Sequence, residues 1–294
     1  MKRKVYYAVE FFNELNTLEI ALETLNDVVD YFIVSESLTS HQEGLPKPLY
    51  FEENKQRFAK FLPKIIHQII DDTPDDFSDL SLIQAKDEIH RIVLDKTKIN
   101  IRGIETQKNY CRDGYEKECL LRAMGTCKDE DIVIVSDADE IPDPNAVRLV
   151  IDNFDPTLVY NFNLNHYWFY FNCLKTDEWI GNRLLTFANF KFKSMNELRD
   201  MKRLSGVIVK NGGWHFSFQG SVETIKQKIQ SYGEKSINRP DVVDNIKEFI
   251  DDCITNQHDF FYRSAEFKIV PIDESFPSYL YNNQEKFKEL IHEF

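Results

Sequence analysis

The chain has 294 residues, of which 42% are hydrophobic and 29% are charged, a composition typical of a globular protein with a sizeable core. Its formal net charge is −13, which argues against a nucleic-acid binder, because such proteins carry a basic surface. An acidic protein that handles an anionic substrate needs local lysines, local arginines or a divalent metal to offset the repulsion.

The cysteines and the apolar segments bear on the compartment. The five cysteines are odd in number and include no Cys-x-x-Cys pair, so neither a zinc site nor a disulfide framework is expected. The N-terminus lacks the apolar run of a signal peptide, and no segment approaches about 18 uninterrupted apolar residues. We expect a soluble, cytoplasmic protein without an integral membrane segment.

The first third of the chain predicts alternating strands and helices. We expect strands over 5–9, 30–37 and 64–71, helices over 13–29 and 54–62, and a proline- and glycine-broken loop over 41–51. The first helix is amphipathic, since its leucines recur at spacings of three and four. This alternation is typical of a parallel sheet with right-handed crossovers.

The rest of the chain has a different pattern. We expect a loop over 71–81, a helix within 104–124 and a buried strand ending at 137. Strands rich in aromatic residues are expected over 157–172, 183–190, 206–218 and 266–272, and helices over 221–232, 242–256 and 283–294. The sequence therefore predicts an α/β fold with a mixed, mostly parallel central sheet flanked by helices. We expect one domain over 1–294, with a nucleotide-binding half (1–140) and a more antiparallel acceptor half (141–294).

The stretch IVIVSDADEIPDP, from Ile132 to Pro144, carries the strongest single motif. Asp137 and Asp139 follow an apolar strand, at the end where open α/β sheets bind ligands. Carboxylates at i and i+2 can reach one cation, and oxygen ligands suit Mn²⁺ or Mg²⁺ held on a diphosphate. The alternative is an acidic turn that only caps the strand. Glu140 fits a supporting position better than that of a base.

A second motif, NGGWHFSFQGS, runs from Asn211 to Ser221. His215 is a candidate third metal ligand or a donor to phosphate, and Ser217 with the backbone near Gly220 could meet an anion before the next helix. The alternative is a core histidine in an aromatic strand. Glycines on both sides of His215 indicate a close backbone approach, which favours the functional interpretation.

Several ordered stretches resemble glycosyltransferase family 17. They are FFNELNTLEIAL, VVDYFIVSES, KPLYFEENKQRF, IVIVSDADEIPDP, GGWHFSFQGSVETIKQKIQSY and FPSYLYNNQEKFKEL, and together they cover nearly the whole chain. The resemblance implies a GT-A-like fold and inversion at the anomeric carbon. It implies a UDP-sugar donor, with GlcNAc as the expected sugar, and a glycan acceptor on a glycoprotein, polysaccharide or glycolipid.

The resemblance also implies roles for individual residues. Asp137 and Asp139 would hold a divalent metal, Mn²⁺ or Mg²⁺, on the donor diphosphate, with His215 as a third ligand. The expected donor contacts are Phe12, Asn13, Glu14 and Glu36 for the nucleoside and Lys226 or Lys228 for the diphosphate. Arg183 is either a further diphosphate contact or a surface cation.

Inverting transfer needs a carboxylate base across the pocket from the metal. Asp177 and Glu178, between the metal motif and His215, are the first candidates. Glu223 is a rival, and its other interpretation is a first-turn residue that favours the helix dipole. Nearby Tyr167, Trp168 and Trp179 could form a platform for a sugar, or simply fill the core.

Two other classes of function fit parts of the sequence. A phosphohydrolase of the haloacid-dehalogenase type also places Asp-x-Asp after an apolar strand, but near its N-terminus rather than in mid-chain. A non-catalytic carbohydrate-binding or inactive transferase-like protein would share the fold, although the retained Asp137, Asp139 and His215 argue against it.

Overall fold

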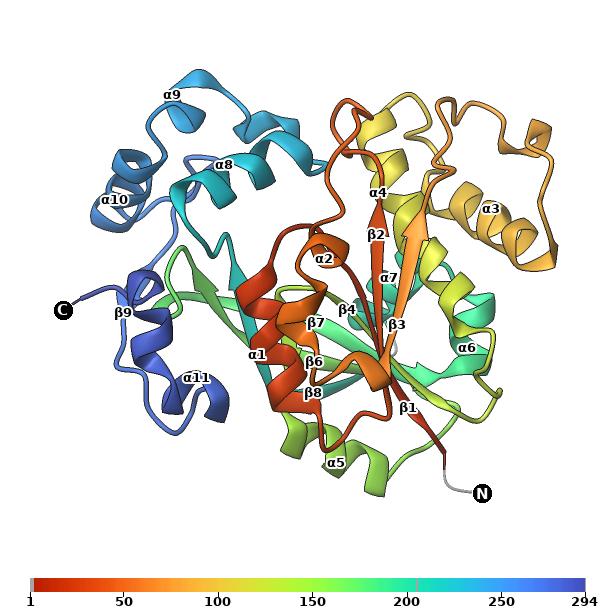
Figure 1. Cartoon of the computed structure of the whole chain (residues 1–294), viewed down its shortest axis with the longest axis horizontal. Helices are drawn as coiled ribbons and strands as arrows, with labels where there is room; N and C mark the ends of the chain where they lie inside the picture. The colour runs from red at the N-terminus through yellow and green to blue at the C-terminus, as the bar shows by residue number, and fades with distance from the viewer. Residues whose placement is uncertain (1–2, 205, 294) are drawn as a thin grey trace.

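The computed structural model describes residues 3–204 and 206–293. Within them, nine strands form one sheet in the order β3-β2-β1-β4-β7-β6-β8-β5, and β9 pairs with β7 (Figure 1). The strands are β1 (Val5–Glu10), β2 (Tyr31–Ser37), β3 (Ile65–Ile70), β4 (Ile132–Asp137), β5 (Glu140–Pro142), β6 (Tyr160–Trp168), β7 (Cys173–Thr186), β8 (Val207–Ser217) and β9 (Phe267–Ile269).

The sheet is parallel on one side and mixed on the other. β1, β2, β3 and β4 run parallel, so their carboxyl ends lie together. β7 is antiparallel to β4, β6 and β9, whereas β6 and β8 are parallel to each other. The more antiparallel second half is therefore confirmed apart from the β6–β8 pair, and parallel and antiparallel pairs are equally frequent in the sheet as a whole.

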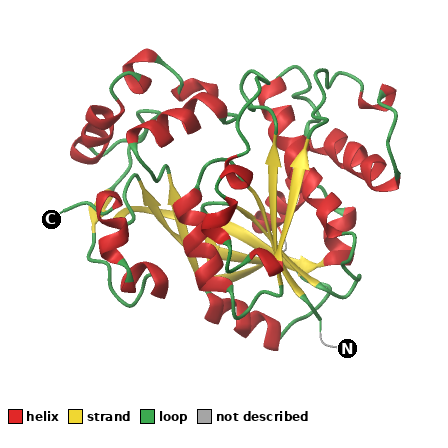
Figure 2. Ribbon diagram, viewed as in Figure 1, coloured by secondary structure: helices red, strands yellow, loops and turns green. Residues whose placement is uncertain are grey.

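Helices cover both faces of the sheet, because alternate side chains of each buried strand point to opposite sides (Figure 2). Val5, Tyr7 and Val9 of β1 join one apolar cluster, and Tyr6 and Ala8 join another. The first cluster packs on α1 (Leu15–Leu25), α2 (Tyr50–Glu53), α5 (Pro144–Asp152), α11 (Ser278–Asn282) and the 3₁₀ turns η1 (Lys55–Phe58), η2 (Leu62–Lys64) and η6 (Gln284–Leu290). The second packs on α3 (Glu88–Asn100), α4 (Lys108–Cys119), α6 (Phe187–Phe192), α7 (Met195–Leu204), η3 (Leu80–Leu82) and η4 (Leu120–Met124).

A third apolar cluster lies at the carboxyl ends of β6 and β8 and at the amino end of β7. It joins Trp168 and Phe218 to the helices α8 (Val222–Ser231), α9 (Pro240–Val243) and α10 (Ile246–Asn256) and to η5 (Lys235–Ile237). Figure 1 shows α8, α9 and α10 grouped together, on the opposite side of β2 from α3. Among the described residues, no helix is both long enough and apolar enough to cross a bilayer.

Most of the expected elements are present, and the differences have local causes. The strand expected over 183–190 ends at Thr186, whose side chain accepts a hydrogen bond from Asn189 N and so caps α6. The helices expected over 54–62 and 283–294 are only 3₁₀ turns, and the expected loop over 41–51 ends in the first turn of α2. The helix expected within 104–124 divides into α4 and η4, and α3 was not predicted.

Candidate active site

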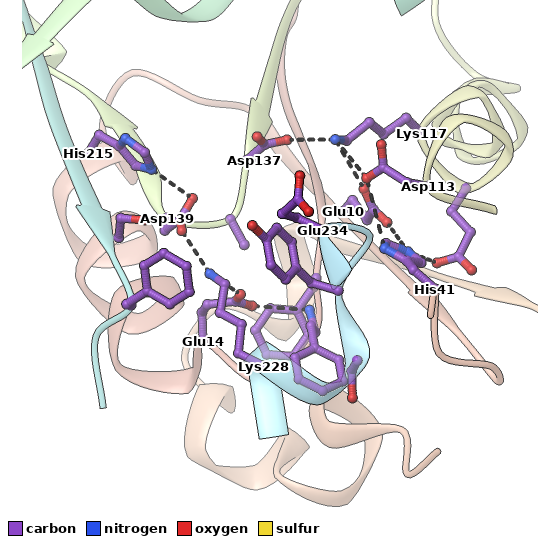
Figure 3. Close-up of a pocket in the computed structure, with 18 of the residues that line it drawn as sticks. Glu10, Glu14, His41, Asp113, Lys117, Asp137, Asp139, His215, Lys228 and Glu234 are labelled. Atoms are coloured by element: carbon purple, nitrogen blue, oxygen red, sulfur yellow. Dashed lines mark hydrogen bonds and ion pairs between the residues drawn. The ribbon is translucent and has the colours of Figure 1, made fainter. Parts of the chain in front are cut away.

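A cavity of about 380 Å³ lies at the carboxyl ends of β1, β2 and β4 (Figure 3). Glu10 ends β1, His41 follows β2, and Asp137 and Asp139 lie at the end of β4 and in the turn after it. Helices α4 and α8 supply Lys117 and Lys228 to its other walls, and the aromatic residues Phe12, Trp168, Trp179, Phe218, Tyr232 and Phe261 complete much of the lining. The cavity is therefore where a parallel sheet is expected to bind its ligand.

The turn from β4 into β5 buries Asp139 against the rest of the site. β5 pairs with β8 so that Glu140 lies opposite His215. The backbone oxygen of Asp139 accepts a hydrogen bond from Phe216 N at 2.8 Å. Its carboxylate Oδ1 lies 3.4 Å from His215 Nε2, and its Oδ2 lies 2.9 Å from Lys228 Nζ. The predicted residues Asp139, His215 and Lys228 are thus in contact.

Glu14 holds Lys228 from the other side. Its Oε1 lies 2.8 Å from Lys228 Nζ, while its Oε2 accepts hydrogen bonds from the backbone N–H groups of Phe12 and Asn13, both at 3.1 Å. Burial alone would lower the pKa of Lys228, but Asp139 and Glu14 raise it above its usual value. The same contact, opposing the effect of burial, lowers the pKa of Asp139. Both groups are therefore charged at neutral pH.

Asp137 lies on the other side of the turn from Asp139. Its Oδ1 is 3.5 Å from Lys117 Nζ, and its side chain is 42% exposed. Lys117 also lies 2.9 Å from Asp113, within the same helix. Figure 3 shows Asp137 facing Lys117 while Asp139 faces His215 and Lys228. The structure thus brings together only two of the three expected metal ligands.

A different trio has its ligand atoms close together. Among the described residues, Glu10, His41 and Asp113 form a group of three whose candidate ligand atoms all lie within 4.8 Å of one another. His41 Nε2 is 2.9 Å from both Glu10 and Glu116. Burial raises the pKa of Glu10 to about 7, despite the opposing charge of His41. Lys117 Nζ, 4.0 Å from Glu10 and in contact with Asp113, already supplies positive charge here.

Sequence reasoning missed these residues, although one signal pointed to them. Glu10 is the last residue of β1 and lies directly opposite Asp137 of β4 in the parallel register. The position of Glu10 at the end of the strand next to β4 therefore indicated that its carboxylate lies in the same site as Asp137. His41 and Lys117 come from a loop and a helix whose approach depends on tertiary packing, so no local pattern marks them.

Asp139 and His215 have the chemistry and spacing to hold a divalent cation. Two adjacent ligands of Mg²⁺ or Mn²⁺ lie about 3 Å apart when each is about 2.1 Å from the metal, close to the 3.4 Å between Oδ1 and Nε2. The His215 ring is fixed between the rings of His166 and Trp179, with both centroid distances 4.5 Å. Its buried Nδ1 has no hydrogen-bond partner among the described residues. Among the described residues, neither ring nitrogen of His215 makes a hydrogen bond to a neutral group. A metal can therefore bind either nitrogen without breaking such a bond.

Glu140, the third carboxylate of the motif, is buried and holds a residue of the cavity wall in place. It is 2% exposed, its Oε1 accepts a hydrogen bond from Trp179 Nε1 at 2.7 Å, and its backbone oxygen accepts one from Tyr7 at 2.8 Å. A Cβ at Gly181 would lie 2.8 Å from its Cδ, so only glycine leaves it room. Glu140 therefore fixes Trp179, which lines the cavity and packs on His215.

The three candidate bases lie in different surroundings. Asp177 accepts a hydrogen bond from His166 Nδ1 at 2.8 Å, and His166 lines the cavity. Glu178, one residue further along β7, is exposed and accepts a hydrogen bond from Asn163. Glu223 is exposed in the first turn of α8. None of the three is among the residues that line the cavity directly.

The other predicted contacts divide into two groups. Phe12, Glu14 and Ser217 line the cavity, whereas Asn13, Glu36, Arg183 and Lys226 do not. Glu36 is fully buried and accepts hydrogen bonds from the backbone N–H groups of Phe51 and Glu52, so it fixes the start of α2. Tyr167 packs in the core on Phe216 and Phe276.

Comparison with known proteins supplies the family. The family model for glycosyltransferase family 17 matches residues 1–292, nearly the whole length of the sequence. A search of curated proteins found no match. The match includes every residue of the cavity, from Glu10 on β1 to Arg263 after α10. The chain therefore belongs to glycosyltransferase family 17 and is a glycosyltransferase.

Proposed function

We propose that this enzyme transfers a sugar, with GlcNAc as the expected unit, from a UDP-sugar to a glycan hydroxyl with inversion at the anomeric carbon. The observation that carries the proposal is the contact of Asp139 with both His215 and Lys228 in the cavity at the end of β4. A carboxylate and an imidazole suit a divalent metal, and an ammonium suits the diphosphate bound to it. We assign the fold to the GT-A type on the same grounds, as one domain with a donor half and an acceptor half.

The reaction would be a single displacement. The acceptor oxygen forms a bond to the anomeric carbon while the bond from that carbon to the diphosphate oxygen breaks, and UDP leaves with both electrons. A bound Mn²⁺ or Mg²⁺ would supply charge stabilisation for the leaving diphosphate. Lys228 adds a fixed positive charge beside it, held in place by Glu14. The low dielectric of a buried site makes such charges more effective than in water.

The proton of the acceptor hydroxyl needs a base, and we propose Asp177. Burial and the neighbouring His215 lower the pKa of His166 to about 4, so His166 is neutral and donates from Nδ1 to Asp177. Burial alone would raise the pKa of Asp177, but His166 and Lys175 lower it to about 2. The carboxylate is therefore ionised at neutral pH and held by a residue that lines the cavity.

Aromatic residues supply a surface for the acceptor. Trp168, Trp179 and Phe261 line the cavity, and the face of an aromatic ring suits the apolar face of a sugar. Trp179 is fixed by its hydrogen bond to Glu140 and Trp168 by one to His166. We propose that the glycan packs on this wall.

The direct test is a donor screen with the purified protein and Mn²⁺. UDP-GlcNAc, UDP-glucose and UDP-galactose are incubated with and without excess chelator, and UDP release is measured. We expect metal-dependent UDP release, fastest with UDP-GlcNAc. Binding of free glycans without turnover of any nucleotide sugar would instead identify a non-catalytic carbohydrate-binding protein.

A further inference from the structure

Lys47 carries a buried positive charge for which the described residues supply no close partner. It lies in the loop between β2 and α2 and lines the cavity. Its Nζ is buried and has no hydrogen-bond partner among the described residues. Its Nζ lies over the ring of Phe12, 5.3 Å from the ring centroid. A buried ammonium without hydrogen bonds is costly to a folded protein, so its retention calls for a ligand.

The other cations of the cavity wall are all paired. Lys117 contacts Asp113 and Asp137, and Lys228 contacts Glu14 and Asp139. Arg263 lies 2.6 Å from Asp259. An anion that enters the cavity must therefore compete with a carboxylate at each of these three residues, but not at Lys47.

The loop that carries Lys47 is held in place. Prolines 46 and 48 flank the residue and restrict its backbone, and Lys47 N donates to Leu38 O at 2.9 Å. Arg112 of α4 donates from Nη1 to the backbone oxygens of His41 and Gln42, at 2.8 and 3.1 Å. These contacts reduce the backbone entropy that the loop would otherwise lose when Lys47 binds a ligand.

The same loop is joined to the helix that carries Lys228. The backbone N–H groups of His41 and Gln42 donate to Ser231 O of α8, at 2.9 and 3.1 Å. Glu14, which binds Lys228, is among the carboxylates that act on Lys47 through their charge. Lys47 and Lys228 are therefore held by connected elements at one cavity.

We propose that Lys47 binds the phosphate oxygens of the donor diphosphate, together with Lys228. The inference rests on the proposed function, which supplies a diphosphate as the ligand. The cavity wall carries seven carboxylates and four Lys or Arg side chains, so an anionic donor needs every available positive charge. Lys47 provides one that pairs with no carboxylate among the described residues.

The test compares Lys47→Met and Lys47→Arg with the wild type and with Lys60→Met. Lys60 is the matched control, because its side chain is 63% exposed and pairs only with Glu23 at the surface among the described residues. Binding of inorganic pyrophosphate, UDP and uridine is measured by calorimetry in the presence of Mg²⁺, and thermal unfolding is followed without ligand.

We expect Lys47→Met to weaken pyrophosphate and UDP binding by about tenfold to a hundredfold, the size of a lost hydrogen bond to a charged group. Uridine binding should change by less than about twofold on the same scale. The unliganded variant should unfold at the same temperature as the wild type or higher, because a buried unpaired charge has been removed. Lys47→Arg should retain part of the affinity, and Lys60→Met all of it.

Unchanged pyrophosphate and UDP affinity in Lys47→Met would overturn the inference while leaving the proposed function intact. An equal loss for uridine would also overturn it, because Lys47 would then contact the nucleoside. If pyrophosphate binding depends on Lys47 but the wild type binds UDP no more tightly than pyrophosphate, the phosphate-binding role of Lys47 would be supported. The proposal of a UDP-sugar donor would then be contradicted. Absence of binding by the wild type to all three ligands would contradict both.

Discussion

Asp139 Oδ2 lies 2.9 Å from Lys228 Nζ, although 89 residues separate them in the chain. The contact joins the turn after β4 to helix α8, and His215 on β8 approaches the same carboxylate at 3.4 Å. Asp139 is 6% exposed, so its charge is not well screened by solvent. The three elements meet at the carboxylate that is the proposed metal ligand.

Replacing Asp139 by asparagine keeps the shape of the side chain and removes its charge. We expect turnover to fall by at least about a hundredfold, because the proposed metal ligand is weakened. Lys228 keeps Glu14 as a partner, so the variant should remain folded. Turnover and the circular dichroism spectrum are compared with those of Asp129→Asn, a change at an exposed surface pair. Wild-type turnover in Asp139→Asn would remove Asp139 from the site.

Two groups of residues in the cavity are candidate metal sites, and histidine variants separate them. His215→Ala should weaken Mn²⁺ binding by about tenfold or more, because one of the two proposed ligands is lost. His41→Ala should have a smaller effect, since Lys117 already supplies positive charge beside Glu10 and Asp113. Calorimetric titration with Mn²⁺ measures both. The opposite order of effects would place the metal at Glu10, His41 and Asp113.

Asp177→Asn tests the proposed base. The asparagine oxygen can still accept the hydrogen bond from His166, so the local structure should be kept. We expect kcat to fall by about 10²–10⁴-fold while UDP affinity is unchanged. Glu178→Gln and Glu223→Gln are measured beside it. A large kcat loss in one of these instead would transfer the role of base to that residue.

Gly181→Ala tests the support that Glu140 gives to Trp179. The added Cβ would lie 2.5 Å from Leu164 Cδ1 and 2.8 Å from Glu140 Cδ, so both must move. We expect a loss of about 1–3 kcal/mol in the free energy of unfolding and lower turnover. Gly125→Ala is the control, because no heavy atom lies within 4 Å of its added Cβ and its φ is −61°. Equal stability of the two variants would mean that the glycine is not required.

Asp72 predicts a pH dependence of stability away from the cavity. Burial alone would raise its pKa, but Arg122, at 2.7 Å, and Lys86 lower it to about 2. Its contribution, about 2 kcal/mol, should be complete above its unfolded pKa of 3.8 and lost as the pH falls towards 2. The free energy of unfolding is measured with denaturant at pH 7 and at pH 3. The difference between the two values should therefore be smaller for Asp72→Asn than for the wild type. An identical difference in the variant would remove this ion pair from the acid response.

The buried strands were predictable because most of their residues are apolar. β1, β2 and β4 have near-continuous apolar runs, whereas α3 buries His90, Lys96, Thr97 and Asn100 beside Val93 and Leu94, so polar residues interrupt its apolar face. Some of these polar residues have distant partners in the chain, such as Glu118 for Lys96 at 3.0 Å. A buried face that mixes polar and apolar residues is a weaker local signal than a continuous apolar run.

The candidate site was predictable only in part, for a related reason. Asp139 and His215 belong to short motifs that follow or lie in strands, and Lys228 follows one of them in the chain. Lys47 and Lys117 reach the cavity from a loop and from a helix. Their roles depend on ion pairing, because Lys117 pairs with Asp113 whereas Lys47 Nζ has no hydrogen-bond partner among the described residues. Pairing of that kind is a property of the folded structure.

The most direct test of the central claim is the anomeric form of the sugar released from UDP-α-GlcNAc. With Mn²⁺ and no glycan, water takes the place of the acceptor, and proton NMR recorded during the first minutes distinguishes the two anomers before they interconvert. A single displacement at the site of Asp139, His215 and Lys228 predicts that β-GlcNAc appears first and that Asp139→Asn releases none. Initial release of α-GlcNAc, or release unaffected by Asp139→Asn, would contradict the account.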